Sequence, residues 1–364
     1  MRLTIPQPQL LKTLQTVERA VNDRTTLPIL ANILLEASEH ELTLTATDLD
    51  VGIQCRFPLT HPTECGAVTL PARKLTTVVR ELPDESVILE AKKNHTATLN
   101  CGAVSFRIPG LPAEDFPVLP VMDKGEAVSI PQGALKRLIT ETMHAMSMEE
   151  TRFILNGALL ATQKDTLAMV ATDGRRLAVA KSPVVGGAAL TAVIPAKTIR
   201  ELARLLEDDE EDVTIAPLKD NQLTLRFGPV TMITRLIEGQ FPQYEKVIPP
   251  PSKQGLTCDR QTLINAVRRA SLMTTATSQA VMFEISGSVL VVSKESAELG
   301  SAREEVRVTY NGEPLAVAFN PEFWLDVLKV LDGSEVTIEL SGPDRPAVIR
   351  RPDFLFLVLP MKAA

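Results

Sequence analysis

The sequence predicts an α+β protein in which one domain, made of antiparallel strands and two helices, is repeated three times. Three observations lead to this prediction: motifs that recur at a nearly constant spacing, helical stripes of apolar residues, and two-residue alternation in the segments between them. The chain has 364 residues, which suits two to three domains of ordinary size. We therefore expect domains at residues 1–124, 125–250 and 251–364.

The repeat rests on several independent landmarks rather than on one motif. Four sets of residues recur at intervals of 124 to 128 residues: Ile5, Ile130 and Cys258; Pro71, Pro195 and Asn320; Asp48 and Asp173; Phe116 and Phe241. Agreement of four landmarks on nearly one period indicates copies of one domain. The boundaries fall in segments rich in proline and polar residues, at 117–125 and 249–255.

Each repeat follows one order of elements. A short strand comes first, then a helix with apolar residues at helical spacing, such as Leu10, Leu14 and Val17. Strands with period-two alternation follow, as in residues 42–47. A second helix begins after Pro71 and its counterparts, where a proline suits the first turn because its missing N–H would be unpaired anyway. We thus expect strand, helix and three strands, twice per repeat, with two helices on one face of the sheet.

Composition excludes several classes of protein. Hydrophobic residues make up 45% and charged residues 23%, close to the globular average. No run approaches about 18 apolar residues, and Pro6 and Pro8 interrupt any signal peptide, so we expect a cytoplasmic protein with no membrane segment. The four cysteines are widely spaced, which predicts reduced thiols rather than disulfides or a zinc site.

The charge is divided unevenly between the predicted helices and the rest of the chain. The net charge is −7, which by itself argues against a nucleic-acid ligand. The six predicted helices nevertheless hold 15 lysines and arginines against eight acidic residues. In a threefold repeat these helices should lie on one side of the molecule, where they would present a basic surface to a polyanion. Only Phe323 and Trp324 are aromatic there, so phosphate contacts are favoured over base stacking.

An enzyme is the main rival class, and the sequence disfavours it. Asp48 and Asp173 are equivalent in two repeats, a whole domain apart, and are better explained as strand-ending residues bonded to turn amides. The four histidines have no metal-ligand spacing, and neither a GxSxG nor a GxxxxGK motif occurs. We therefore expect no catalysis, metal or cofactor. A scaffold that binds only proteins remains an alternative, although it leaves the basic helices without a purpose.

Several motifs closely resemble the bacterial DNA polymerase III β subunits, the sliding clamps, along the whole chain. The motifs are TLPIL at 26–30, PARK at 71–74, LNG at 155–157, ATDGRRLA at 171–178, GQFPQY at 239–244 and LVLPM at 357–361. This resemblance implies a head-to-tail homodimer that closes six domains into a ring around duplex DNA. Twelve helices with axes about 10 Å apart would line a hole a little under 40 Å across, which admits a duplex.

The resemblance also implies two binding sites. DNA-facing positions fall on Arg24, Arg73, Glu149, Arg152, Phe153, Ile154 and Lys197. A pocket for short peptides maps to Leu155, Thr172, Gly174, Arg175, Arg176, Leu177, Pro242, Lys246, Val247, Ser278, Asn320, Phe323, Pro346, Val358, Leu359, Pro360, Met361 and Lys362. Ser278, Lys246 and Phe323 differ from residues that are often aromatic, arginine and tyrosine in relatives, which predicts a shifted peptide preference.

The implied partners follow from the same resemblance. The subunit contact would join Lys74, Phe106 and Ile108 of one chain to Leu272, Met273, Glu298 and Glu304 of the other. Partners would be double-stranded DNA without sequence preference, the DNA polymerase III catalytic subunit, and other polymerases and repair proteins that carry clamp-binding peptides. An ATP-dependent clamp loader is implied as well, because the chain has no ATP-binding loop with which to open itself.

Overall fold

The order of elements predicted for each repeat is confirmed. The computed structural model describes residues 1–22, 25–59, 64–120, 127–185 and 189–362. The first repeat contains β1 (Arg2–Pro6), α1 (Gln7–Val17), β2 (Asn32–Ala37), β3 (Glu41–Thr47), β4 (Val51–Pro58), β5 (Gly66–Pro71), α2 (Ala72–Arg80), β6 (Ser86–Ala91), β7 (Thr96–Cys101) and β8 (Val104–Pro109). This is strand, helix and three strands, twice over.

The other two repeats follow the same order. The second contains β9 (Val128–Pro131), α3 (Gln132–Thr142), β10 (Gly157–Gln163), β11 (Thr166–Thr172), β12 (Arg176–Pro183), β13 (Thr191–Pro195), α4 (Ala196–Leu205), β14 (Asp212–Leu218), β15 (Gln222–Phe227) and β16 (Val230–Arg235). The third contains β17 (Gly255–Asp259), α5 (Arg260–Ser271), β18 (Val281–Ser286), β19 (Val289–Ser296), β20 (Gly300–Arg307), β21 (Thr309–Tyr310), β22 (Leu315–Phe319), α6 (Pro321–Val330), β23 (Glu335–Glu339), β24 (Ala347–Arg350) and β25 (Phe354–Val358). The short β21 pairs with β17, and the first two repeats have single bridges at the corresponding place, Arg2 with Glu64 and Ser129 with Val185.

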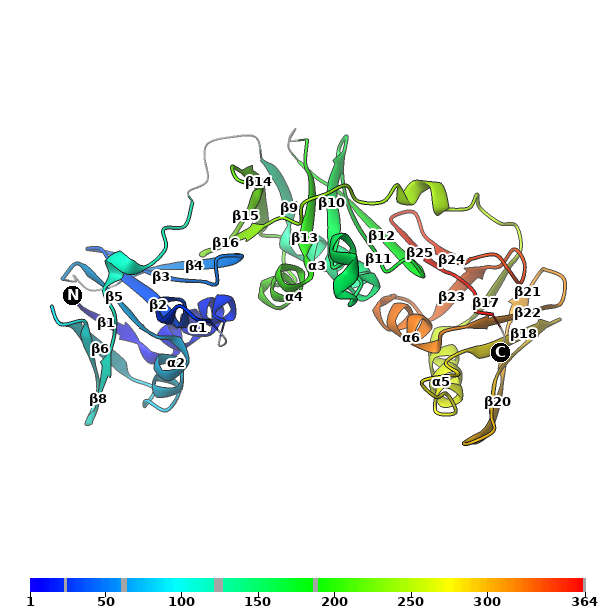
Figure 1. Cartoon of the computed structure of the whole chain (residues 1–364), viewed down its shortest axis with the longest axis horizontal. Helices are drawn as coiled ribbons and strands as arrows, with labels where there is room; N and C mark the ends of the chain where they lie inside the picture. Colours follow the sequence, from blue (N-terminus) through cyan, green and yellow to red (C-terminus); the bar gives the residue numbers. More distant parts are fainter. Residues whose placement is uncertain (23–24, 60–63, 121–126, 186–188, 363–364) are drawn as a thin grey trace. The chain divides into compact units, whose positions relative to one another are not determined.

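The helices form where their apolar stripes can be buried. Leu10, Leu14 and Val17 of α1 are fully buried, as the helical spacing predicts. Helix α1 packs on β3, β4 and α2, and α5 packs on β19, β20 and α6, so each pair of helices lies side by side (Figure 1). Most of the stability of such short helices comes from this packing rather than from propensity.

Within the described residues the strands assemble into four antiparallel sheets, two of which contain strands of two repeats. The first and third repeats each contribute a four-stranded sheet, in the orders β1-β6-β7-β8 and β20-β19-β18-β22. An eight-stranded sheet, β5-β2-β3-β4-β16-β15-β14-β9, joins the first repeat to the second through β4 and β16. A nine-stranded sheet, β13-β10-β11-β12-β25-β24-β23-β17-β21, joins the second repeat to the third through β12 and β25.

The chain consequently divides into two compact units rather than along its repeats. Unit 1 contains residues 1–133, 185–188 and 204–236, and unit 2 contains residues 134–184, 189–203 and 237–364. Each large sheet lies within one unit. The second repeat is therefore shared between the two units, because its two halves belong to different sheets.

The predicted chemistry of the strand-ending aspartates and of the cysteines can be checked directly. The Asp48 carboxylate accepts hydrogen bonds from the amides of Asp50 and Val51, and the Asp173 carboxylate from those of Arg175 and Arg176. Both aspartates thus hold turns, as expected. All four cysteines are free thiols, and three are buried, whereas Cys65 is exposed.

Candidate functional site

An apolar pocket of about 200 Å³ lies within unit 2, where strands β11, β12 and β25 of the nine-stranded sheet begin or end. Its walls come from the turn between β11 and β12, from the segment 242–247 and from the last strand with its tail. The lining residues are Leu155, Thr172, Gly174, Arg175, Arg176, Leu177, Pro242, Gln243, Tyr244, Val247, Leu357 and Leu359. Beneath it is a buried cluster of apolar side chains to which Leu155, Leu177 and Leu357 belong.

Local hydrogen bonds fix the β11–β12 turn at the edge of this pocket. The Thr172 hydroxyl donates to the Arg176 carbonyl (2.6 Å) and accepts from the Gly174 amide (3.0 Å). Gly174 has φ +87°, a left-handed conformation that favours glycine. The Leu359 amide donates to the Arg175 carbonyl (2.9 Å), so the C-terminal tail is held against the turn.

Arg176 connects this turn to α6. Its Nε donates to the Asp173 carboxylate (3.1 Å) and its Nη1 to the Asp326 carboxylate (2.8 Å). The guanidinium also lies 4.3 Å from the centre of the Phe323 ring, a cation–π contact. Only 11% of the Arg176 side chain is exposed. Arg176 is therefore a structural link beneath the pocket as well as part of its lining.

Tyr244 separates this pocket from a second cavity of about 400 Å³, also within unit 2. Burial, followed by the neighbouring Glu245 carboxylate, raises the pKa of Tyr244 to about 12. Its phenol is consequently neutral at physiological pH. A neutral aromatic wall suits an apolar ligand.

Nine of the predicted peptide-binding residues meet in this one pocket, and the others do not line it. Val358 is fully buried instead, and its neighbour Leu357 lines the pocket, because successive residues of a strand point to opposite faces. Lys246 is exposed beside the pocket. The residues that sequence reasoning missed are Gln243, Tyr244 and Leu357. The motifs GQFPQY and LVLPM contain all three residues. The sequence therefore indicates the segments that form the pocket, but not which of their side chains point into it.

The remaining predicted peptide-binding residues lie on the third repeat or on the tail. Asn320 accepts from the Glu322 amide (2.9 Å) and so caps α6. Met361 pairs with Ala318 of β22 through a backbone bridge. Ser278 accepts a hydrogen bond from Lys294, Phe323 lies over Arg176, and Pro346 directly precedes β24. Pro360 is half-buried and Lys362 is exposed.

The predicted DNA-facing residues are placed differently from one another. Arg73 and Lys197 are exposed in the first turns of α2 and α4. Phe153 is 62% exposed, whereas Ile154 packs against the apolar cluster beneath the pocket. Arg24 lies outside the residues that the structure describes.

Arg152 turns toward the peptide pocket. Its Nη1 donates to the Asp173 carbonyl (3.0 Å), and its Nε pairs with the Glu149 carboxylate (3.3 Å). A Cβ atom at Gly174 would approach this guanidinium to 2.9 Å. The Arg152 side chain, predicted to contact DNA together with Glu149, therefore occupies the rim of the pocket.

The predicted subunit-contact residues lie on β8 and β20, in the turn before β20, in α2 and directly after α5. Phe106 on β8 is 38% exposed, Leu272 after α5 is 67% exposed, and Lys74 and Glu298 are exposed. Met273 is half-buried. Ile108 is buried in its own domain, so only its backbone edge faces outward. Glu304 on β20 already pairs with Arg269 of α5.

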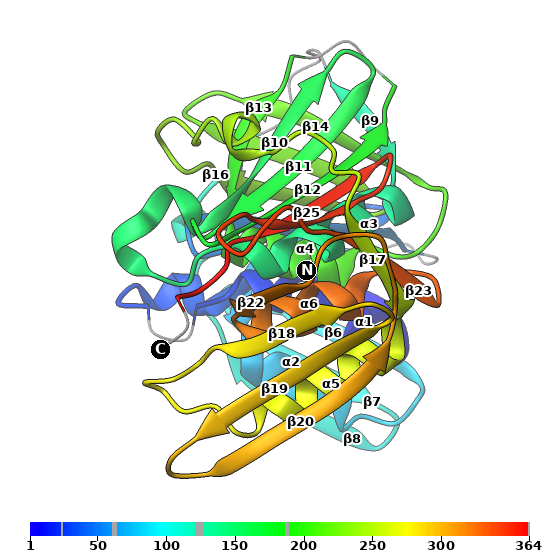
Figure 2. The same cartoon turned by 90° about the vertical axis from the view of Figure 1, so that its right-hand side faces the viewer.

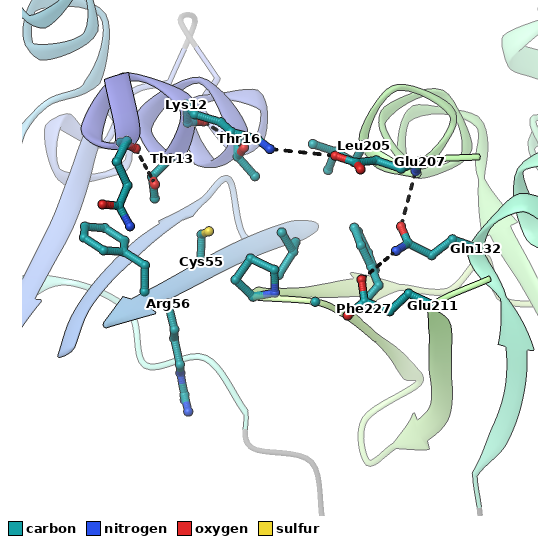
Figure 3. A pocket seen from close by; sticks show the side chains of 15 residues that line it. Lys12, Thr13, Thr16, Cys55, Arg56, Gln132, Leu205, Glu207, Glu211 and Phe227 are labelled. Carbon is teal, nitrogen blue, oxygen red and sulfur yellow. Dashed lines mark hydrogen bonds and ion pairs between the residues drawn. The ribbon is translucent and has the colours of Figure 1, made fainter. Parts of the chain in front are cut away.

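A third pocket, of about 360 Å³, lies within unit 1 between α1, β4 and the turn that joins β15 to β16 (Figure 3). Its polar groups bond to one another: Lys12 pairs with Glu207 (3.8 Å), and the Gln132 amide donates to Glu211 (3.1 Å). Burial raises the pKa of the Cys55 thiol there to about 11. The thiol is thus protonated and a poor nucleophile.

The part of the chain covered by the structure contains no group of three or more side chains placed to hold a metal ion. None of its helices is long and apolar enough to cross a membrane. A threefold-repeated α+β chain with basic helices and an apolar pocket at the end of a sheet defines a repeat-built binding protein.

Comparison with known proteins defines the family. Family models for the N-terminal, central and C-terminal domains of the DNA polymerase III beta subunit match residues 1–120, 129–243 and 245–361. The chain therefore belongs to the DNA polymerase III beta subunit family. Beta sliding clamps of Pseudomonas putida and Bacillus subtilis are 34% and 32% identical, with all of each chain covered.

Solved structures agree. A sliding clamp of Pseudomonas aeruginosa bound to griselimycin is 34% identical with a TM-score of 0.95. The Bacillus subtilis sliding clamp is 31% identical with a TM-score of 0.94. Both comparisons cover 100% of each chain. The predicted resemblance is confirmed, since the family extends over the whole chain.

Proposed function

We propose that two copies of this chain close head to tail into a six-domain ring that encircles duplex DNA. The ring would slide along the duplex and tether the DNA polymerase III catalytic subunit, as a processivity factor without catalysis, in the bacterial cytoplasm. Its domains would be the repeats at 1–124, 125–250 and 251–364. The match of all three clamp-domain models to this chain, in order, supports the proposal.

Ring closure would use one terminal strand from each of the two four-stranded sheets. β8 and β20 are terminal strands in the described part of the chain, and such edges present unpaired backbone groups. Pairing β8 of one copy with β20 of another would cover both edges and bury Phe106 and Leu272. A heterologous contact of this kind forms a ring when it closes. Apolar burial would stabilise it more than the rim charges of Lys74 and Glu298.

DNA contact would be made by basic residues in the first turns of helices, where a positive charge does not stabilise the helix. Arg73 and Lys197 lie in the first turns of α2 and α4, where the helix dipole disfavours a positive charge. Neither of those first turns contains an acidic residue. A phosphate at a helix N-terminus would be attracted by both the cation and the dipole. Such contacts are independent of sequence and weaken with salt, which permits sliding.

The apolar pocket of unit 2 would receive short peptides from partners. Aliphatic and aromatic anchors would fill the space between Leu155, Leu177 and Leu359, because these walls are apolar. The same pocket would serve the catalytic subunit, the ATP-dependent clamp loader, and other polymerases and repair proteins in turn. One pocket shared by many peptides requires an adaptable surface.

Retention on DNA of different topology tests the proposal. The protein is loaded on primed circular DNA with a clamp loader, washed at high salt, and followed before and after the circle is cut. We expect retention on the circle and loss on linearisation, since a ring leaves DNA only over an end. Equal loss from circle and line would contradict topological linkage and would favour a protein-binding scaffold.

A further inference from the structure

A buried lysine in the third repeat makes no ion pair in the described part of the chain. Lys294 on β19 is 7% exposed, and its ammonium donates one hydrogen bond, to the Ser278 hydroxyl (2.6 Å). An ammonium has three donors, and burying it without an opposite charge is costly. On the neighbouring strand β20, the carboxylate of Glu304 is already bonded to Arg269.

The other two repeats show that the fold does not need this cation. Continued by one residue, the pairing of β18 with β19 places Lys294 opposite Val281. The same continuation in the other repeats places Ala46 opposite Ile33 and Ala171 opposite Ala158, so Ala46 and Ala171 are the counterparts of Lys294. Both alanines are fully buried. Ser278 likewise lies three residues before Val281, at the place that Leu30 and Leu155 occupy in the other repeats, where both leucines are buried. A leucine–alanine pair has thus become a serine–lysine pair in the third repeat alone.

The pair lies at the end of the sheet that the C-terminal tail reaches. Val281 at the start of β18 pairs with Phe319 at the end of β22, and Ala318 of β22 pairs with Met361 of the tail. β22, β18 and β19 lie side by side in Figure 2. At about 4.8 Å between strands, the tail and β19 are about 15 Å apart, so a lysine side chain covers part of that gap.

The tail in turn starts in the apolar pocket, because Leu359 lines it two residues before Met361. An extended peptide spans about 3.3 Å per residue, so about five residues beyond the pocket would reach the start of β18, beside Ser278. The missing negative charge can therefore be supplied by a bound peptide.

We propose that Lys294 and Ser278 form a carboxylate-binding subsite that selects an acidic group on the partner peptide, a few residues from the apolar anchors. This inference rests on the proposed peptide site in unit 2. The carboxylate is either an Asp or Glu side chain or the C-terminus of the peptide. It would take hydrogen bonds from the Lys294 ammonium, and the Ser278 hydroxyl would turn to donate a second. A charge-assisted bond of this kind is shorter and stronger than a neutral one.

Three fluorescent peptides test the subsite on the full-length protein. All carry the same aliphatic and aromatic anchors; one ends in Asp with an amidated C-terminus, one in Asn with an amidated C-terminus, and one in Asn with a free C-terminus. We expect the acidic peptides to bind the unmodified protein about tenfold more tightly than the neutral one. The better of the two acidic peptides identifies the source of the carboxylate.

Variants then locate the preference. Lys294→Met keeps the length of the side chain and removes the charge, so we expect it to bind all three peptides with the affinity of the neutral peptide. Lys329→Met, on exposed α6 surface, is the matched control and should keep the tenfold preference. Ser278→Ala removes the second hydrogen bond but leaves the ammonium in place, so we expect a preference between those of the unmodified protein and Lys294→Met, which tests the subsite independently of the Lys294 variant.

Each contrary pattern overturns the subsite in a distinct way. Equal binding of acidic and neutral peptides to the unmodified protein would exclude carboxylate selection while leaving the apolar pocket intact. A preference that survives Lys294→Met would place the cation elsewhere. Loss of DNA retention in Lys294→Met with an unchanged peptide preference would assign Lys294 to phosphate instead. Failure of every peptide to bind would refute the peptide pocket itself.

Discussion

At the scale of single residues, Arg176 shows how a polar side chain can organise an apolar site. It bonds two carboxylates and lies on an aromatic ring while only 11% of its side chain is exposed. Removing one member of a buried ion pair leaves the others uncompensated. The β11–β12 turn and α6 should therefore depend on this residue for their mutual position.

Arg176→Met tests that dependence. The loss of two ion pairs and the cation–π contact should lower the free energy of unfolding by about 1–3 kcal/mol, with Asp173 and Asp326 partly exposed. Arg175→Met is the matched control, because the Arg175 side chain is exposed and its change should alter stability by less than about 0.5 kcal/mol. Urea unfolding of both variants gives the comparison. Equal stabilities would show that Arg176 contributes no more than a surface arginine.

Two buried groups near α3 should give opposing pH dependences. Burial raises the pKa of Glu141 to about 7, against the opposing effect of Arg137, and burial lowers the pKa of His144 to about 4. Between about pH 4.5 and 7 the folded protein holds a proton on Glu141 that the unfolded chain has lost. The contribution of Glu141 to the free energy of unfolding therefore falls as pH rises through that window. His144 resists protonation between about pH 6.5 and 4, so its contribution falls as pH falls. The two slopes cancel between about pH 4.5 and 6.5.

Glu141→Gln removes one of the two slopes. Stability of the variant should rise with pH between about 4 and 6.5, by at most about 1.4 kcal/mol per pH unit, and then level off. The unmodified protein should be nearly flat from about pH 4.5 to 6.5 and decline toward pH 7. Urea unfolding across this range measures both profiles. Parallel profiles would mean that Glu141 has an ordinary pKa in the folded protein.

At the pocket, the motifs in the sequence indicate the types of the lining residues but not the directions of their side chains. Leu357 lines the pocket, whereas the predicted Val358 is fully buried. Only the register of β25 with β12 decides which of two adjacent apolar residues faces the site. The inward turn of Arg152 onto the Asp173 carbonyl depends likewise on a tertiary contact that no spacing encodes.

At the scale of elements, the C-terminal tail is the piece that links the pocket to the third repeat. The Leu359 amide bonds to the Arg175 carbonyl, and the Met361 amide bonds to the Ala318 carbonyl (2.8 Å). The tail therefore crosses from the end of one sheet to the edge of another within unit 2. Its side chains complete the pocket without contributing to β25 itself.

Deletion of residues 359–364 should abolish peptide binding while dimerisation persists. The tail supplies Leu359 to the pocket and is separate from strands β8 and β20, so the proposed subunit contact is left intact. Fluorescence anisotropy with a clamp-binding peptide, and with a scrambled peptide as control, measures the first effect. Sedimentation measures the second. Unchanged peptide affinity in the truncated protein would place the pocket elsewhere.

Element order was predictable from the sequence, whereas the joining of sheets was not. Alternation and helical stripes are local patterns, so they predict the strands and the six α-helices of the described residues. The pairing of β4 with β16 and of β12 with β25 connects residues far apart in the chain. No local pattern encodes such partners. This is why three sequence repeats fold into two compact units.

At the scale of the whole molecule, the charge is distributed by element. The predicted helices hold 15 basic against eight acidic residues, a net +7, whereas the rest of the chain holds 23 basic against 37 acidic residues, a net −14. A uniformly basic protein would bind DNA everywhere and slide poorly. Diffuse cations on the helices, with an acidic remainder, favour weak binding of a polyanion at the helices rather than elsewhere.

Reversal of charge at Arg24, Arg73 and Lys197 together tests this arrangement. Changing all three to glutamate should shorten retention on circular DNA, because each protomer would then bind fewer phosphates. The slope of log affinity against log salt should fall by up to about 6, roughly one for each of the six cations changed in the two-copy ring. The control reverses three cations on strands and turns, Arg56, Lys219 and Arg226, which are all exposed. Both triple variants change the net charge equally, so a difference between them reports position rather than total charge. If sedimentation shows intact dimers and retention is unchanged in the first variant, the basic helices do not face DNA.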